Sequence, residues 1–264
     1  MIRWVDLHCH THLSLDGVSR PRAILRRARA AGLAAVAVTD HGTIAGAIQT
    51  AALRQPDDPE VIVGAEYSTD AGHILGLFLR EEIDLGDAPR WPWREVVAAI
   101  RAQGGIAVLA HPTKTIRPLV PDVLAGVDGM EVYNARAEFS RFARANARAL
   151  AAWRAWCLEH PDAPLIATAG SDAHLPAEIG HARCAISGEG SLREALRQGP
   201  IAVQARGTAP LVEATSQAVK TWRGRQWAKL PQAVARLGWH GARTATRLGR
   251  LGVLAHWSLT AGEG

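Results

Sequence analysis

The chain has 264 residues, 48% of them hydrophobic, which suffices for one large domain or for two small ones. It has no apolar run of eighteen residues and no basic-then-apolar opening, so we expect neither a membrane span nor a secretory signal. The net charge is +5, and three widely spaced cysteines favour reduced thiols, so we expect a cytoplasmic protein.

The charge is unevenly distributed along the chain. Residues 1–204 carry 21 Lys and Arg against 23 Asp and Glu, a net charge of −2. Residues 205–264 carry 9 against 2, a net charge of +7, together with four of the nine Trp. The sequence therefore predicts an almost neutral domain over residues 1–204, followed by a basic, Trp-containing tail over residues 205–264.

Short β-type runs recur through the first domain, with helical patterns between most of them. In chain order the runs are IRWVDLH, LAAVAVTD, VIVGAE, HILGLFL, GIAVLAH, GMEVYN and LIATAGSD. The first helical pattern follows Ser19 and Pro21 and ends at Gly32. Other helices are expected near residues 43–54, 93–103, 138–159 and 191–198. This alternation predicts a mostly parallel sheet, and about seven such units favour a barrel.

Almost every apolar run ends in a residue that is able to bind a metal ion. These residues are His8, His10, Asp40, His41, Glu66, His111, Glu131, Asn134, Asp172 and His174. In a β/α barrel the carboxyl ends of the strands converge on one face. We therefore expect these residues, which are far apart in sequence, to meet in one pocket.

The segment VDLHCHTHLSLDG places two of these residues on one face of a strand. His8 and His10 alternate with Cys9, so both imidazoles point the same way and Cys9 packs behind them. Asp6 shares their face but lies deeper in the strand, whereas Asp16 follows in a loop from which it is able to fold back. Imidazoles suit Zn, Mn and Fe, and carboxylates are able to bridge two ions, so the pattern predicts a metal site.

Seven segments in this order resemble the PHP family (polymerase and histidinol phosphatase). They are DLHCHTHLSLDG, VTDHGT, GAEYS, GHILGLFL, VLAHP, GMEVYN and GSDAH, and the resemblance covers about residues 3–204. It implies a distorted (β/α)7, TIM-like barrel, here followed by a basic tail that we expect to be helical. It also implies two or three divalent metal ions (Zn, Mn or Fe) and hydrolysis of phosphate esters.

The resemblance also implies the metal ligands. His8 and His10 match the first histidine pair of the family. Glu66 matches the carboxylate that bridges two metals, and Asp172 completes the first site. Another site of the family is matched by Asp16, His41 and His174.

The remaining metal site is less complete in this sequence. His111 matches one of its ligands. Many three-metal members supply a further histidine near the position of Glu131, where this chain reads GMEVYN. Either Glu131 or Asn134 substitutes for it, or the site is weak or empty. The sequence therefore does not decide between two and three metal ions.

The expected reaction is in-line attack on phosphorus by a metal-bound hydroxide, held between the ions that share Glu66. Asp172 is expected to take its proton. Arg136 follows a strand end and is the best single candidate to clamp the phosphate at the catalytic centre, because a guanidinium matches phosphate oxygens in pairs. The other candidates for substrate binding are Lys114, Arg117 and His73.

The sequence thus predicts a metal-dependent phosphoesterase for a small phosphate ester, a nucleotide or a short oligonucleotide. Residues 80–105 leave no room for the large mid-barrel insertion of some nucleotide-degrading relatives. Two alternatives stay open. One is a C–N hydrolase of the amidohydrolase type, which uses a similar barrel and ligands. The other is a non-catalytic, metal-stabilised module that binds nucleic acid or membrane through its tail.

In the tail, Arg and Lys recur with Trp between them. Such helices suit an anionic membrane or nucleic acid, on whose bases Trp stacks. The favoured alternative is that the Trp side chains pack on the barrel or on another subunit; the sequence does not specify an oligomeric state. The residues concerned are Trp222, Arg223, Arg225, Trp227, Lys229, Arg236, Trp239, Arg243, Arg247, Arg250 and Trp257.

Overall fold

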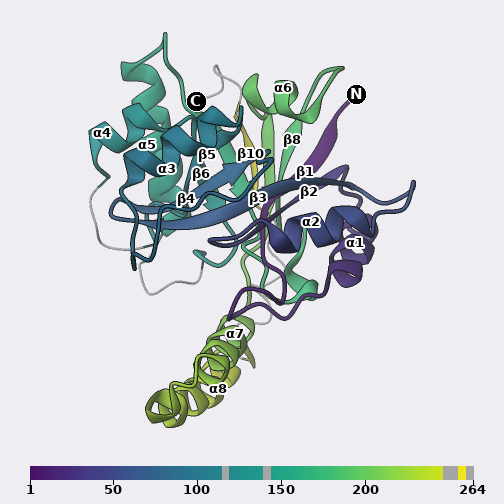
Figure 1. The fold of residues 1–264 in the computed structure, drawn as a ribbon, viewed down its shortest axis with the longest axis vertical. Helices are drawn as coiled ribbons and strands as arrows, with labels where there is room; N and C mark the ends of the chain where they lie inside the picture. Colours follow the sequence, from purple (N-terminus) through teal and green to yellow (C-terminus); the bar gives the residue numbers. More distant parts are fainter. Residues whose placement is uncertain (115–118, 139–143, 246–254, 260–264) are drawn as a thin grey trace.

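The computed structural model describes residues 1–114, 119–138, 144–245 and 255–259. Its ten described strands form one sheet in the order β10-β9-β8-β1-β2-β3-β4-β5-β6-β7. The sheet curls into a TIM-like half-barrel, with α1 and α2 on one side, and α3, α4 and α5 on the other (Figure 1). The expected α/β class is therefore confirmed.

The elements follow the predicted runs closely. The strands are β1 (Arg3–Cys9), β2 (Ala35–His41), β3 (Glu60–Thr69), β4 (Gly72–Leu77), β5 (Ile106–Ala110), β6 (Gly129–Asn134), β7 (Ile166–Gly170), β8 (Ala182–Ile186), β9 (Ala202–Ala205) and β10 (Ala255–Ser258). The helices are α1 (Pro21–Ala30), α2 (Ala45–Ala52), α3 (Trp93–Ala102), α4 (Pro121–Gly126), α5 (Ala145–Glu159), α6 (Leu192–Arg197), α7 (Pro210–Arg223) and α8 (Leu230–Ala245), with short 3-10 turns at Pro176–Glu178 and Trp227–Lys229.

The sheet is mixed, so the expectation of a mostly parallel sheet is wrong. Strands β1, β2 and β3 are parallel, as are β5, β6 and β7. Strand β4 runs antiparallel to both β3 and β5, because a tight turn rather than a helix joins it to β3. Strands β8, β9 and β10 add antiparallel pairs beyond β1. As a consequence, β4 begins at the edge where its parallel neighbours end.

The segment after β7 returns to β1 and curls the sheet. The amide of Asp172 donates to the carbonyl of His8, and the amide of His10 donates to the carbonyl of Ala173, each at 2.8 Å. A Cβ added at Gly170 would lie 2.3 Å from the Cβ of His8, so only glycine permits this approach of the two strands. The carboxyl ends of the first and last parallel strands therefore meet.

The helices cover the sheet with the apolar faces that their sequences predict. In α1, the residues Ile24, Leu25 and Ala28 are buried, as the spacing of a helix face requires. They pack in part against Cys9, which lies fully buried behind the strand face that carries the histidines. Full burial of such an aliphatic side chain stabilises the fold by roughly 1.5–3 kcal/mol.

The tail contains two helices and a strand. Strand β10 pairs with β9, so the end of the described chain belongs to the main sheet. Helices α7 and α8 pack on each other and project from the sheet (Figure 1). Among the described residues, no helix combines the length and the apolarity needed to cross a membrane.

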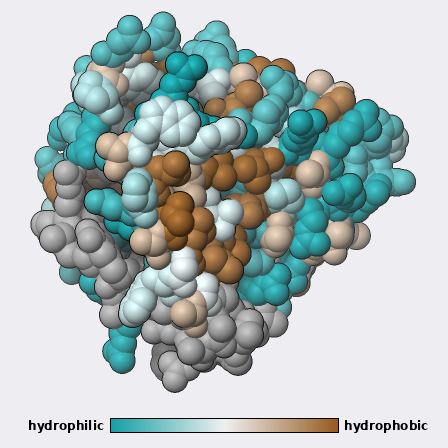
Figure 2. All heavy atoms as spheres, turned by 90° about the horizontal axis from the view of Figure 1, so that it is seen from below, coloured by the Kyte–Doolittle hydropathy of each residue, from teal (hydrophilic) through white to brown (hydrophobic). Residues whose placement is uncertain are grey.

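Three of the four tail Trp are exposed in the single chain, so they do not pack on the barrel, and packing on another subunit stays a prediction. Trp222, Trp227 and Trp239 are 59%, 56% and 66% exposed, and only Trp257 packs on the sheet, with its ring centroid 5.1 Å from that of Tyr133. Seen from the side of α7 and α8, hydrophobic residues gather at the centre of the face, with hydrophilic residues around them (Figure 2). Contact of the tail with nucleic acid or membrane stays a prediction, and Arg247 and Arg250 lie outside the described residues.

Candidate metal centre

Glu66, near the end of β3, lies at the middle of the candidate site and is 1% exposed. Its two oxygens face different groups of histidines. Oε2 lies 3.5, 3.4 and 3.0 Å from nitrogens of His8, His10 and His41, whereas Oε1 lies 2.6 and 3.0 Å from nitrogens of His73 and His111. This edge of the sheet therefore brings five histidines to one carboxylate, and the sequence predicts four of them as metal ligands.

The first cluster consists of His8, His10 and Asp172. The Nε2 atoms of His8 and His10 face each other at 3.1 Å, and each lies within 3.7 Å of Oδ1 of Asp172. Nδ1 of His8 lies 3.1 Å from Oε1 of Glu131. Since a carboxylate accepts hydrogen bonds, Nδ1 carries the proton and Nε2 presents its lone pair to the cluster. The group offers two nitrogens and an oxygen to one ion.

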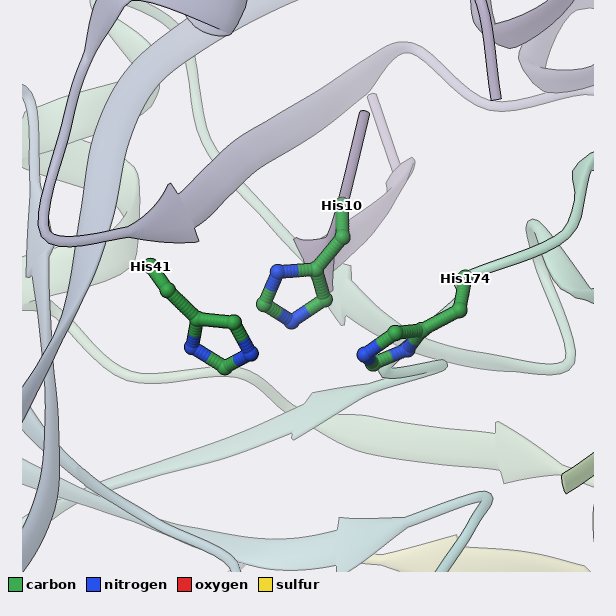
Figure 3. A group of neighbouring side chains, drawn as sticks. All are labelled: His10, His41 and His174. Carbon is green, nitrogen blue, oxygen red and sulfur yellow. The ribbon is translucent and has the colours of Figure 1, made fainter. Parts of the chain in front are cut away.

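The second cluster consists of Asp16, His41 and His174, close to His10. Figure 3 shows the rings of His10, His41 and His174 turned toward one another. Oδ1 of Asp16 is buried and has no hydrogen-bond partner among the described residues, although it lies 3.5 Å from Nε2 of His41 and 3.3 Å from Nε2 of His174. A buried carboxylate oxygen without a partner is costly, and a cation between these three atoms would satisfy it.

The third cluster consists of Glu66, His73 and His111, whose ligand atoms lie within 4.8 Å of one another. The sequence predicts His73 as a substrate-binding residue, whereas the structure places it among the candidate metal ligands. His73 is near the start of β4, where it pairs with Ala110 of β5. Because β4 is antiparallel, its first residues lie at the edge where the parallel strands end. The short connection between Thr69 and Gly72 was the signal in the sequence for a hairpin, and a hairpin would have placed His73 at this edge.

Glu131 and Asn134 hold other residues instead of taking the place of a missing histidine. Glu131 contacts His8 through Oε1, and through Oε2 it accepts hydrogen bonds from the His111 amide at 2.7 Å and from Asn134 Nδ2 at 3.1 Å. Oδ1 of Asn134 accepts from the backbone amide of Arg136. These contacts orient candidate ligands, a role that outer residues have in many metal sites.

The electrostatics of the centre couple its carboxylates to its histidines. Burial alone lowers the pKa of His8 and of His41, but the neighbouring carboxylates outweigh it and raise both pKa values. Burial alone raises the pKa of Glu66, but the surrounding histidine rings outweigh it and hold that pKa well below its usual range. The pKa of Asp16 is likewise lowered, since contacts with His174 and His41 outweigh burial. Burial and the same two rings lower the pKa of His10. Ionised carboxylates and a neutral imidazole are the ligand forms of these groups.

Two candidate ligands have a strained backbone. His111 and Asp172 have φ angles of +30° and +53°, in the left-handed region that residues other than glycine rarely adopt. Such strain persists only where the surrounding structure enforces it, and it is concentrated at functional sites. At Asp172, the backbone N–H donates a hydrogen bond to the His8 carbonyl at 2.8 Å, which holds the residue in this conformation.

A cavity of about 450 Å³ opens onto the three clusters, which is within the range of small-molecule sites. Three cationic side chains from separate elements line it: Arg90, Lys114 and Lys220. Nζ of Lys114 lies 3.1 Å from Oδ2 of Asp172, so it stands beside the first cluster. Arg117, another expected phosphate ligand, lies outside the described residues.

Arg136 also lines the cavity, but its guanidinium has other partners than a substrate. Nε and Nη2 donate to the carboxylate of Glu178 at 2.9 and 2.8 Å, and Nη1 donates to Oγ of Ser216 at 2.7 Å. Arg136 is 2% exposed. The same carboxylate accepts from the His174 amide at 3.0 Å, so the pair holds a candidate ligand.

The fold and these clusters define an α/β protein with a candidate metal centre at the edge where the strands of a curled sheet meet. Comparison with protein families gives the particular family. The model of the PHP domain matches residues 6–104, and a PHP-associated model matches residues 162–201. The chain belongs to the PHP family, which is metal-dependent.

Individual relatives agree with this assignment. An uncharacterized protein of Methanocaldococcus jannaschii is 39% identical over 142 residues, which span 49% of this chain and 81% of that protein. A 5'-3' exoribonuclease of Haemophilus influenzae is 40% identical over 81 residues, only 29% of either chain. A two-domain protein of Bacteroides vulgatus, described as containing a predicted PHP-like metal-dependent phosphoesterase, has the same fold (TM-score 0.60, 20% identity, 77% of this chain and 64% of that chain).

Proposed function

We propose that this protein is a metal-dependent phosphoesterase that hydrolyses a small phosphate ester, a nucleotide or a short oligonucleotide. The observation that carries this proposal is the position of Glu66, whose two oxygens face separate histidine groups at the base of a cavity with cationic walls. A purely structural metal site seldom needs so many donors next to an open cavity.

The residues fit two or three divalent ions such as Zn, Mn or Fe. The unpartnered Oδ1 of Asp16 and the facing nitrogens of His8 and His10 are positions that a cation would satisfy. When bound, such ions supply Lewis acidity toward a phosphoryl oxygen and activate water. The residues that would hold them are His8, His10, Glu66 and Asp172 for one ion, Asp16, His41 and His174 for another, and Glu66, His73 and His111 for a third.

The side chains around the centre have separate roles in the proposed reaction. Arg90, Lys114 and Lys220 attract an anionic substrate into the cavity. Burial alone lowers the pKa of Lys114, but the Asp172 carboxylate outweighs it and raises that pKa, so the side chain stays charged beside the reacting end. Glu66 and Asp172 would hold metal ions at the reacting centre, and Asp172 would accept a proton during hydrolysis. Arg136 supports His174 through Glu178 and does not clamp the phosphate.

The named relatives favour a substrate related to nucleic acid. The Haemophilus relative is an exoribonuclease, and an error-prone DNA polymerase of Rhodopirellula baltica is 39% identical over 72 residues, 26% of this chain and 6% of that enzyme. The names of these two relatives specify RNA and DNA. A mononucleotide or short oligonucleotide is therefore the first substrate class to test, beside simple phosphomonoesters.

The test measures hydrolysis by the full chain after chelation and reloading with Mn²⁺, Zn²⁺ or Fe²⁺, as inorganic phosphate released from monoesters and as nucleotides released from oligonucleotides. Substrates are an aryl phosphate, mononucleotides and short oligonucleotides. Glu66→Ala should lower kcat/KM by more than about a hundredfold, beyond the usual effect of residues that only support a ligand. Glu159→Ala, at an exposed position on α5, is the matched control and should be unchanged.

Two outcomes would contradict the proposal. One is that no substrate is hydrolysed with any of the three ions. The other is that Glu66→Ala retains the activity of the control variant. Release of ammonia from amide substrates, measured in parallel, would indicate a C–N hydrolase instead.

A further inference from the structure

Helix α7 of the tail forms one wall of the candidate metal centre. Glu213, Gln217 and Lys220 lie along one face of this helix and line the same cavity as Glu66. The helix follows the last residue matched by either family model, residue 201. The charge distribution of the sequence assigns α7 to a separate basic tail, whereas the structure places it at the site.

Lys220 contacts the second cluster directly. Its Nζ lies 2.9 Å from Oδ2 of Asp16, while Oδ1 of the same carboxylate points to His41 and His174 without a hydrogen bond. Asp16 is almost fully buried. One oxygen of Asp16 therefore binds a lysine of the tail, and the other faces the position where an ion would bind.

Arg223, less than one helical turn further on, holds the loop that carries Asp16. Its Nη1 donates to the carbonyl of Gly17 at 2.6 Å and lies 3.3 and 3.4 Å from the carbonyls of His12 and Ser14. One guanidinium nitrogen therefore contacts three carbonyls of a six-residue turn. A positive charge satisfies them better than a neutral donor would.

The loop over residues 12–17 also has anchors outside α7. The amide of His12 donates to the carbonyl of Ser19 at 2.9 Å, and the amide of Gly17 donates to the carbonyl of Ser14 at 3.1 Å. Asp40 holds its beginning, through the amide of Thr11 and the hydroxyl of Ser14. Leu13 and Leu15 are 41% and 52% exposed, so apolar burial contributes little to the loop. The side chain of Asp16 accepts its hydrogen bond from Lys220, so α7 contributes the contact made directly to this carboxylate.

We propose that Lys220 and Arg223 are positioning residues of the metal centre. They hold the loop over residues 12–17 so that Asp16 presents a single oxygen to an ion bound with His41 and His174. This inference rests on the proposed function only in requiring that the centre binds metal. It makes the tail part of the catalytic unit, with α7 acting on metal affinity without touching the ion.

The test titrates the chelated full chain with Mn²⁺, and bound metal is counted by calorimetry and elemental analysis. Lys220→Met and Arg223→Met should each weaken one class of sites by about tenfold to a hundredfold, the usual effect of residues that orient a ligand. Lys229→Met and Arg236→Met, at exposed positions in the same tail, are the matched controls and should stay within about twofold of the wild type. Lys220→Arg should retain most of the affinity.

A double-mutant comparison separates positioning from loss of folding. Asp16→Asn should weaken the same class of sites, and adding Lys220→Met should then have no further effect. Thermal unfolding of the metal-free variants checks that the fold is intact. The inference is overturned if Lys220→Met and Arg223→Met bind Mn²⁺ like the controls, or if Lys220→Met acts equally in both backgrounds. If the wild type binds Mn²⁺ but hydrolyses nothing, the phosphoesterase proposal fails. The double-mutant comparison still shows whether Lys220 acts on metal affinity through Asp16.

Discussion

The buried pair of Arg136 and Glu178 gives the sharpest quantitative prediction, because the sequence and the structure assign Arg136 different roles. Both side chains are at most 2% exposed. Two hydrogen bonds join them, and Ser216 accepts a third from the guanidinium. Arg136→Met keeps the approximate volume but leaves the carboxylate of Glu178 without its counter-charge. The structure therefore predicts a loss of stability, whereas a phosphate clamp would predict a loss of substrate affinity.

The expected cost follows from the partners that remain. Removing one member of a buried ion pair costs about 3–5 kcal/mol. Glu178 would still accept from the amides of His174 and Leu175, so we expect a value near the lower end, about 3 kcal/mol. At about 2–4 °C per kcal/mol, the midpoint of thermal unfolding falls by roughly 6–12 °C. The double variant with Glu178→Gln should be more stable than Arg136→Met alone, because the buried residue is then neutral and still accepts both amides.

The assay is urea unfolding of the chelated protein at 25 °C, followed by circular dichroism, together with KM for a phosphate ester. The stability loss and its partial recovery in the double variant should both appear. A structural role of Arg136 is refuted if Arg136→Met costs less than about 1 kcal/mol, the level of an ordinary surface pair, and instead raises KM strongly. That result would restore the role in phosphate binding that the sequence suggests.

Two further predictions concern histidines. His73→Ala should remove one ion per chain from the metal-loaded protein by elemental analysis, whereas His160→Ala, exposed at the end of α5, should remove none; equal metal content in both would refute the third cluster. Burial, Arg206 and Arg27 lower the pKa of His181 to about 4. Because this pKa lies below the unfolded value of about 6.5, stability is lost as pH falls from about 6.5 to about 4, by up to about 3 kcal/mol. His181→Asn should lack this part of the loss, seen as a smaller shift of the unfolding midpoint between pH 7 and pH 4.5; identical shifts in the two proteins would contradict the burial argument.

Local periodicity was sufficient to predict much of the candidate metal centre. The alternation of His8 and His10 in a strand places both on one face whatever the rest of the fold does, and the first cluster confirms it. Strand ends with metal-binding side chains, such as Glu66 and His111, meet because parallel strands share an edge. The apolar face of α1 followed from helical spacing in the same way.

The sequence by itself determined the family, the α/β class and most of the candidate ligands, because these follow from short-range patterns and from segments in a fixed order. Only the tertiary structure decided the direction of β4, and with it the place of His73 at the centre. It also decided the partner of Arg136 and the contacts of Lys220 and Arg223 with a loop about two hundred residues earlier. A pattern of residues fixes which face of an element is buried, but the partner of a buried charge depends on chain packing at long range.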